Sequence, residues 1–126
     1  MSALLLLLEA YVRLLLHDLF MRGHSFVALY QRVKQFPCAP TSTADSSPEA
    51  VCHALDLACA LYGKQVLCLQ RSAVLLQMLR QRGLPAQMMI GAQKMPFKAH
   101  AWVEVHGQVV NDRLASRENF LVLEVC

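Results

Sequence analysis

A Gly-Leu-Pro sequence at residues 83–85 divides this chain into two parts with different hydrophobic patterns. Before it, apolar residues recur every three or four positions, the spacing of amphipathic helices. After it come short runs rich in β-branched and other apolar residues, as in strands. A glycine followed by a proline is a common helix end, because proline cannot continue a helix. The sequence therefore predicts an α+β fold, with N-terminal helices followed by a small antiparallel sheet.

The helical part is itself interrupted twice. Residues 2–36 contain no proline and one glycine, Gly23, so we expect two helices there, or one that breaks near Gly23. The stretch 37–48 holds three prolines and five Ser or Thr residues, which is the composition of a linker. We therefore expect an N-terminal helical segment at 1–36, a linker at 37–47 and the main domain at 48–126.

The main domain is expected to begin with two helices. The first starts at Pro48 and ends at Tyr62, and the second runs from residue 67 or 68 to Arg82. In the second helix, one stripe collects a cysteine, a serine and three leucines: Cys68, Ser72, Leu75, Leu76 and Leu79. The strands that follow are expected to pair in sequence order, as a meander, at 87–92, 99–105, 108–112 and 120–125.

Composition excludes several classes of function. The 12 Lys and Arg residues against 9 Asp and Glu residues give a net charge of +3, and the basic residues are scattered, so no nucleic-acid binding is expected. The Leu-rich start lacks the features of a signal peptide, and Glu9 and Arg13 interrupt it before it reaches the length of a membrane span. Without an export signal, the five cysteines are expected to be free thiols in a reducing cytoplasm.

Cys68 is the cysteine best placed for chemistry. Near the first turn of a helix, exposed N–H groups and the positive end of the helix dipole favour a thiolate over a thiol. The alternative is that Cys68 is simply buried, as unpaired cysteines often are and as we expect for Cys52 and Cys59.

A thiol nucleophile needs a base and a group that orients the base. If residues 105–107 form a three-residue hairpin loop with Gly107 in the left-handed position, His100 faces Asp112 on the neighbouring strand and Trp102 faces Val110. Trp102 and Val110 would then screen the pair from water. A two-residue loop would put His100 and Asp112 on opposite faces. The alternatives are that His100 and Trp102 are ordinary strand residues and that Asp112 belongs to a turn.

The remaining polar residues are less specific. The amide of Gln65 is a candidate oxyanion donor beside the backbone N–H of Cys68, or else lies on a solvated loop. Arg71 either binds a substrate carboxylate or pairs with an acid such as Glu104. No metal-ligand spacing and no glycine-rich loop are present, so neither a metal nor a cofactor is expected. The other histidines have no evident partner and are expected to be solvated: His17, His24, His53 and His106.

Three strings together resemble a known family. They are CLQRSAVLLQMLRQRGLPAQMMIG from Cys68, PFKAHAWVEVHGQVVND from Pro96 and FLVLE from Phe120. They look like the leader peptidases of lasso-peptide biosynthesis, transglutaminase-like cysteine peptidases related to papain. The resemblance covers about residues 48–126, and the family's nucleophile, histidine and aspartate fall in the same order.

The resemblance implies an enzyme that removes the leader from a ribosomally made lasso precursor before macrocyclisation. Cys68 would be the nucleophile, His100 the general base and Asp112 the orienting acid, within a transglutaminase-like core. The family's stand-alone forms work with a separate leader-binding protein and an ATP-dependent, asparagine-synthetase-like macrocyclase, so these partners and the precursor's leader region are implied.

Two alternatives stay open. The same residues would serve an acyl transferase in which an amine replaces water, and a non-catalytic scaffold would bind a precursor without cutting it. The Leu-rich segment 1–40 either docks a partner protein or simply covers the catalytic core.

Overall fold

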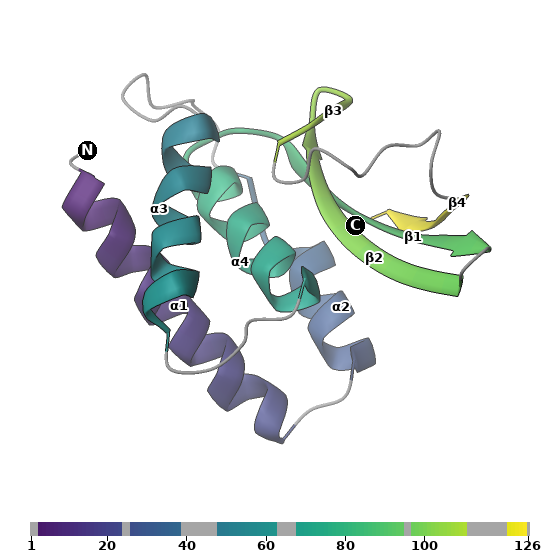
Figure 1. Ribbon diagram of the computed structural model, residues 1–126, viewed down its shortest axis with the longest axis horizontal. Coiled ribbons are helices and arrows are strands. Elements are labelled where there is room, and N and C mark those ends of the chain that lie inside the picture. The colour runs from purple at the N-terminus through teal and green to yellow at the C-terminus, as the bar shows by residue number, and fades with distance from the viewer. Residues whose placement is uncertain are drawn as a thin grey trace.

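The computed structural model describes residues 3–23, 26–38, 48–62, 68–94, 97–110 and 121–125. Within these ranges the chain forms four helices and then four strands (Figure 1): α1 (Ala3–Arg22), α2 (Phe26–Gln35), α3 (Pro48–Leu61), α4 (Cys68–Gln81), β1 (Ala86–Lys94), β2 (Phe97–Val105), β3 (Gln108–Val109) and β4 (Leu121–Val125). The predicted α+β class is confirmed, and so are the break near Gly23 and the helix starts at Pro48 and Cys68.

The four strands form one antiparallel sheet in the order β3-β2-β1-β4. The predicted meander is wrong for the last strand, because β4 pairs with β1 rather than β3, with Gly91 opposite Val122. Local turn signals specify the β1–β2 and β2–β3 hairpins, but nothing local specifies which edge a strand returns to after an intervening segment. As a result, β1 lies between β2 and β4 in the middle of the sheet.

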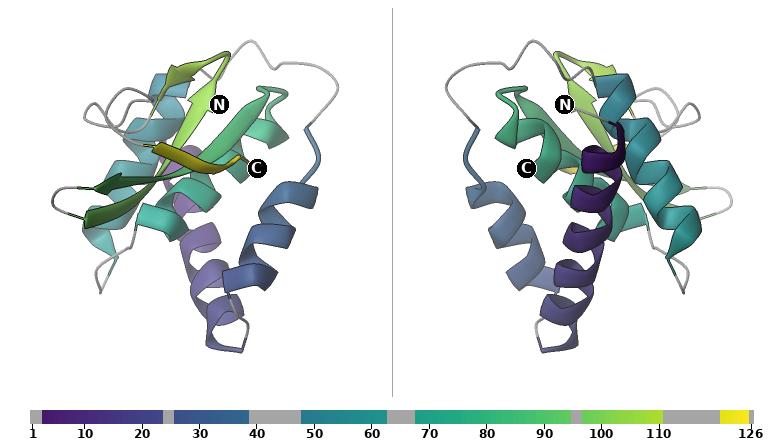
Figure 2. Two further views of the ribbon diagram at one scale, coloured as in Figure 1. Left: turned by 90° about the vertical axis from the view of Figure 1, so that its right-hand side faces the viewer. Right: turned by 90° about the vertical axis from the view of Figure 1, so that its left-hand side faces the viewer.

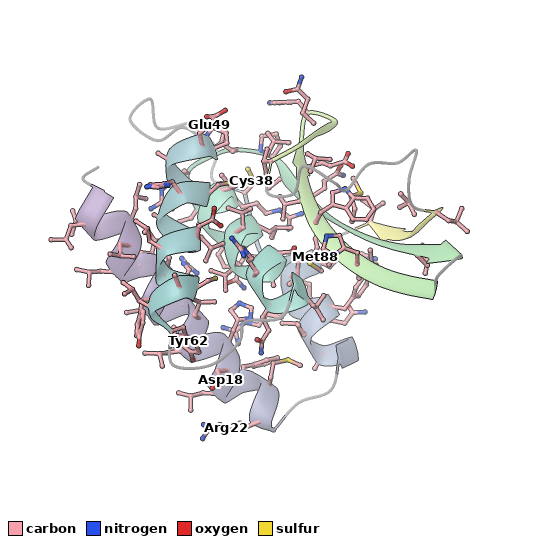
Figure 3. The ribbon with its side chains drawn as sticks, viewed as in Figure 1. Asp18, Arg22, Cys38, Glu49, Tyr62 and Met88 are labelled. Atoms are coloured by element: carbon pink, nitrogen blue, oxygen red, sulfur yellow. The ribbon has the colours of Figure 1, made fainter. Side chains whose placement is uncertain are left out.

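Helices cover one face of this sheet, and α4 lies directly on it (Figures 1 and 2). The alternation of side chains along the strands assigns Met88 and Val103 to the helix side, where they join the main hydrophobic core. Met88 lies between the sheet and the helices in Figure 3. Met89 and Trp102 point the other way and form a second, smaller cluster with Val109 and Val122.

The N-terminal helix belongs to the same core as the rest of the chain. Leu6, Ala10 and Leu14 of α1 are buried together with residues of α3 and α4. Among the described residues, no helix combines the length and the apolarity needed to cross a membrane.

A buried polar network attaches α1 to α4. Arg82 pairs with Glu9, whose pKa is lowered because the hydrogen bonds and charges of Arg82 and Arg13 outweigh the effect of burial. His17 is buried rather than solvated as predicted, with its Nε2 3.0 Å from Oε1 of Gln77. Burial lowers the pKa of His17, as do the nearby charges of Arg32 and Arg13. The prediction failed because His17 shares the helix face of Leu6, Ala10 and Leu14, which faces the core.

Candidate active site

The candidate nucleophile stands at the start of the helix that packs on the sheet. Cys68 is the first residue of α4, as predicted, so it lies where backbone N–H groups lack helical partners and the helix dipole is positive. Its backbone is described, and its side chain lies outside the described residues. The first turn of α4 contains no acidic residue to oppose a thiolate.

A buried hydrogen bond holds this end of α4 against β2. The hydroxyl of Ser72 donates to the carbonyl oxygen of Ala101 over 3.1 Å, and Ser72 is fully buried. Ser72 is one helical turn after Cys68 and on the same face of α4. Ala101 directly follows His100. The hydrogen bond therefore holds the first turn of α4, which begins at Cys68, against the part of β2 that contains His100.

The direction of the Ala101 carbonyl shows which side of β2 the helix approaches. The carbonyl of Val103 accepts a hydrogen bond of 3.0 Å from the N–H of Val110, so it points toward β3. Carbonyls two residues apart along a strand point the same way, so that of Ala101 also points to this edge. Among the described residues, the pairing of β3 with β2 ends at Val109 and Glu104. Ser72 therefore reaches β2 at the edge on which β3 pairs with it.

His100 is half-buried on the sheet face away from the main core. Its ring lies 6.2 Å from that of Trp102, with the two planes 27° apart, which is an offset stacked geometry. Trp102 is fully buried, and its indole Nε1 donates to Oε2 of Glu104 over 2.9 Å. Glu104 thus fixes Trp102, and Trp102 limits the rotation of the imidazole.

The position opposite His100 on β1 is Gly91. Because glycine has no side chain, β1 places nothing directly beside the imidazole on this face. The sequence reasoning missed Gly91, the hydrogen bond between Trp102 and Glu104, and the hydrogen bond of Ser72. The hydrogen bond of Ser72 had a signal in the sequence, because Ser72 stands in a stripe of leucines and a buried hydroxyl needs a partner.

The hairpin between β2 and β3 is tighter than predicted. Val105 pairs with Gln108 and Glu104 with Val109, so the loop has two residues, His106 and Gly107, both with positive φ. The prediction of a three-residue loop is therefore wrong, and so is the register that it gave, in which Trp102 faces Val110.

The corrected register also separates two residues that were expected on one face. Val110 packs against the main core, whereas Trp102 faces the other way, so they do not form a joint screen. Asp112 lies outside the described residues, and the chain bends at Val110 just before it. Asp112 therefore stays a candidate on the resemblance rather than on strand pairing.

Two further candidates, Gln65 and Arg71, were expected near the start of α4. Gln65 lies outside the described residues. Arg71 forms an ion pair with Asp56 of α3, and not with Glu104, which is buried beside Trp102. Arg71 would have to leave Asp56 before it could bind a substrate carboxylate.

The described cysteines outside α4 are free thiols, with Cys38 exposed and Cys52 and Cys59 half-buried on α3. Burial raises the pKa of Cys59. Burial and the charge of Glu49 raise the pKa of the Cys52 thiol to about 11, against an opposing effect of Arg71. These two thiols are poorly suited to nucleophilic chemistry near neutral pH.

The raised pKa of Cys52 predicts a loss of stability in alkali. An unfolded chain loses this proton near the ordinary value of 9.0, while the folded chain keeps it to about 11, so stability falls as pH rises through this window. Thermal unfolding from about pH 8 to about pH 11 should therefore show a smaller decline for Cys52→Ala than for the wild type. Equal declines in the two proteins would contradict the assignment.

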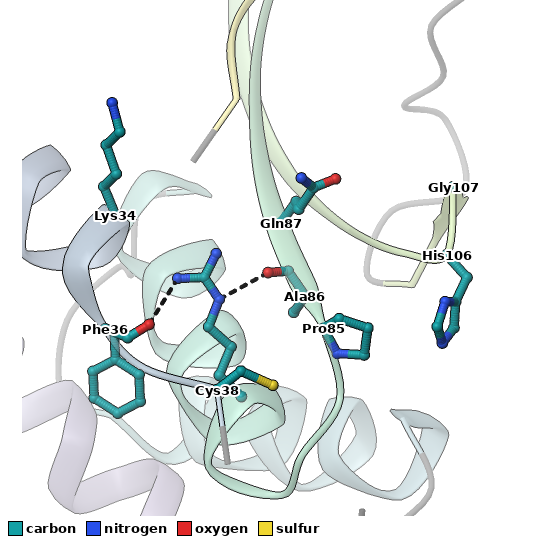
Figure 4. Close-up of a pocket in the computed structure, with 9 residues that line it drawn as sticks. Lys34, Phe36, Cys38, Pro85, Ala86, Gln87, His106 and Gly107 are labelled. Atoms are coloured by element: carbon teal, nitrogen blue, oxygen red, sulfur yellow. Dashed lines mark hydrogen bonds between the residues drawn. The ribbon is translucent and has the colours of Figure 1, made fainter. Parts of the chain in front are cut away.

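A separate cavity of about 530 Å³ lies at the other end of α4 (Figure 4). Its lining includes Lys34, Cys38 and His106, and none of the candidate site residues. The guanidinium of Arg80 beside it donates to the carbonyl oxygens of Val33, Phe36 and Ala86 over 2.9–3.0 Å. These bonds commit Arg80 to holding three segments together. In the described part of the chain, no three His, Cys, Asp or Glu side chains converge as metal ligands would.

Comparisons with known proteins found two similarities of sequence. The sequence profile described as the Transglutaminase-like superfamily matches residues 11–125, which includes most of the N-terminal helices. The chain is also similar to the Microcin J25-processing protein McjB of Escherichia coli, with 41% identity over 56 residues. That match covers 44% of this chain and 27% of the relative, little more than a quarter of its length. No solved structure matches significantly.

Proposed function

Because this chain belongs to the transglutaminase-like superfamily, we propose that it is a cysteine peptidase that removes the leader from a lasso precursor peptide before macrocyclisation. Similarity to a microcin-processing protein supports a role in peptide processing. The proposal assigns Cys68 as the nucleophile, His100 as the general base and Asp112 as the acid that orients His100.

The observation that carries this proposal is the hydrogen bond from Ser72 to Ala101. It holds the turn of α4 that follows Cys68 against the strand that bears His100. His100 is on the face of the sheet away from the main core, and α4 packs on the opposite face. The thiol of Cys68 and the imidazole of His100 would therefore meet around the edge of β2. This is the edge that Ser72 approaches, next to the last described hydrogen bond on that edge, from Val110 to Val103.

The proposed reaction proceeds through an acyl-enzyme. The sulfur of Cys68 attacks the scissile carbonyl carbon, and the thiol proton passes to His100. The carbonyl oxygen becomes an oxyanion that accepts a hydrogen bond from the backbone N–H of Cys68, with the Gln65 amide as a second candidate donor. Collapse breaks the C–N bond, His100 protonates the departing amine of the core peptide, and the leader remains on sulfur as a thioester.

Water completes the cycle. His100 takes a proton from water as the oxygen attacks the thioester, and the proton returns to the sulfur as the leader leaves with a new carboxyl group. The core peptide then has the free amine that macrocyclisation consumes. Trp102 acts through its packing on His100, not by touching the substrate, because it is fully buried.

We also propose partners and a cellular compartment for this protein. The partners are the leader region of the precursor, a separate leader-binding protein and an ATP-dependent, asparagine-synthetase-like macrocyclase. We place the protein in the cytoplasm, since a reducing compartment keeps thiols such as Cys38, Cys52 and Cys59 unpaired.

The test is cleavage of a candidate precursor in ¹⁸O-labelled water, in the presence of the leader-binding protein, followed by mass spectrometry. A peptidase gives leader and core fragments, with one ¹⁸O in the new carboxyl group of the leader. A transglutaminase-like acyl transferase joins the leader to an added amine without taking up ¹⁸O. An intact precursor that is nevertheless bound would contradict catalysis and indicate a scaffold.

A further inference from the structure

Helix α1 carries two apolar faces, and only one of them is buried. Leu6, Ala10 and Leu14 pack into the core. Seven large apolar side chains of the same helix remain between 43 and 64% exposed: Leu4, Leu5, Leu8, Val12, Leu15, Leu16 and Leu19. A single exposed leucine needs no explanation, but seven on one face of a 20-residue helix form a contiguous patch.

The exposed face has the spacing of a coiled-coil seam. Five of its residues alternate steps of three and four along the chain: Leu5, Leu8, Val12, Leu15 and Leu19. This is the a and d pattern of a heptad repeat, in which apolar side chains of one helix insert between those of another. The face that packs into this chain's own core is a separate one. The seam is therefore exposed within the part of the chain that the structure describes.

Contacts on both flanks fix the direction in which the seam points. On one flank, Arg13 donates to Gln77 and Gln81 of α4, and Glu9 pairs with Arg82. On the other flank, Tyr11 packs edge-to-face on Tyr62, with ring centroids 5.4 Å apart. These contacts prevent α1 from turning its leucines inward. Helix α1 itself lies on the side of the helical layer away from the sheet (Figure 2).

The seam also contains a place for an incoming side chain. A shallow cavity of about 380 Å³ is lined by Leu8, Glu9, Val12, Arg13 and Leu16. Four of these residues stand at positions i, i+3, i+4 and i+7, which is the set that forms a hole for a knob in helix packing. Glu9 and Arg13 at its rim pair with each other over 3.1 Å, so both charges at the rim have a partner.

We infer that the seam of α1 binds the same seam of a second copy of this chain. One face supplies both the apolar knobs and the hole, so it is self-complementary, as a twofold dimer interface requires. No charged residue interrupts the seam between Leu5 and Leu19, so two copies meet without like-charge repulsion.

The size of the seam suits this occupant. The seven side chains expose on the order of 500–700 Å² of apolar surface. This is at the upper end of the ~300–600 Å² of the largest patch on a typical monomer, and it approaches the ~800 Å² per partner of a standard interface. The β2 edge at Ala101 stays free in such a dimer, because α1 and the sheet are on opposite sides of α4 (Figure 1).

The test is the molar mass of the full chain at micromolar concentration, measured by light scattering after size exclusion. The wild type should have twice the 14.1 kDa of one chain. Leu8→Glu combined with Leu15→Glu should give the mass of one chain, with an unchanged far-ultraviolet circular dichroism spectrum. Leu123→Glu, at an equally exposed leucine on β4, is the matched control and should remain a dimer.

If the glutamates disturb folding, Leu8→Gln combined with Leu15→Gln repeats the test without added charge. A wild type that is monomeric, even if it then binds a different protein or a lipid vesicle through α1, would overturn the inference. A double variant that folds and remains a dimer would overturn it as well.

Discussion

Replacing Cys68 with alanine should abolish precursor cleavage while leaving the fold and precursor binding intact. Without the sulfur no acyl-enzyme forms, so the rate should fall at least about a thousandfold. Cys68 begins α4, where alanine is accepted by the helix, and the Ser72–Ala101 hydrogen bond does not involve the thiol. Mass spectrometry of the precursor measures the loss, and fluorescence anisotropy of a labelled precursor measures the retained binding.

The matched control is Cys38→Ala. Cys38 is exposed, so replacing it with alanine leaves no gap in the core. It lies on the wall of the separate pocket at the other end of α4, which contains none of the candidate residues. Its variant should cut at the wild-type rate. Cleavage by Cys68→Ala at the wild-type rate would remove Cys68 from the mechanism.

Replacing His100 with alanine should lower the cleavage rate by about 10²–10⁴, the usual contribution of a general acid–base group. Deletion of the ring also removes its stacking on Trp102, but Trp102 stays held by Glu104 and the second cluster, so the fold should survive. Added imidazole should restore part of the rate, since Gly91 leaves the opposite strand position without a side chain.

His53→Ala is the control for this change. His53 is exposed on α3, so its loss should leave the cleavage rate unchanged. A His100→Ala variant with wild-type kinetics would show that the base lies elsewhere. Partial rescue by imidazole separates a lost proton-transfer group from a damaged fold, which imidazole does not repair.

The sequence predicted the parts of this fold that local signals determine. Gly83 and Pro85 mark the end of α4, and the serine and proline before residue 49 mark the start of α3. The start of α4 at Cys68 was predicted from periodicity alone, without a capping residue. The candidate site depends on that boundary, because it puts Cys68 at the helix N-terminus.

The errors arose where distant contacts or unusual backbone geometry decide the outcome. His106 adopts a φ of 52°, which permits a two-residue loop with Gly107. Non-glycine residues seldom take such a value, so a loop with glycine alone in the left-handed region was the natural choice. The return of β4 to β1 and the burial of His17 against Gln77 are contacts between segments far apart in sequence.

The most direct test of the central claim is the pH dependence of Cys68 alkylation, followed by peptide mass spectrometry in the wild type and in His100→Ala. If the start of α4 and His100 together activate the sulfur, Cys68 in the wild type should react at its full rate near neutral pH. This is below the pH of about 9 at which an ordinary thiol ionises. The curve should move to higher pH in His100→Ala. Alkylation of Cys68 that rises only near that pH, and equally in both proteins, would contradict the account.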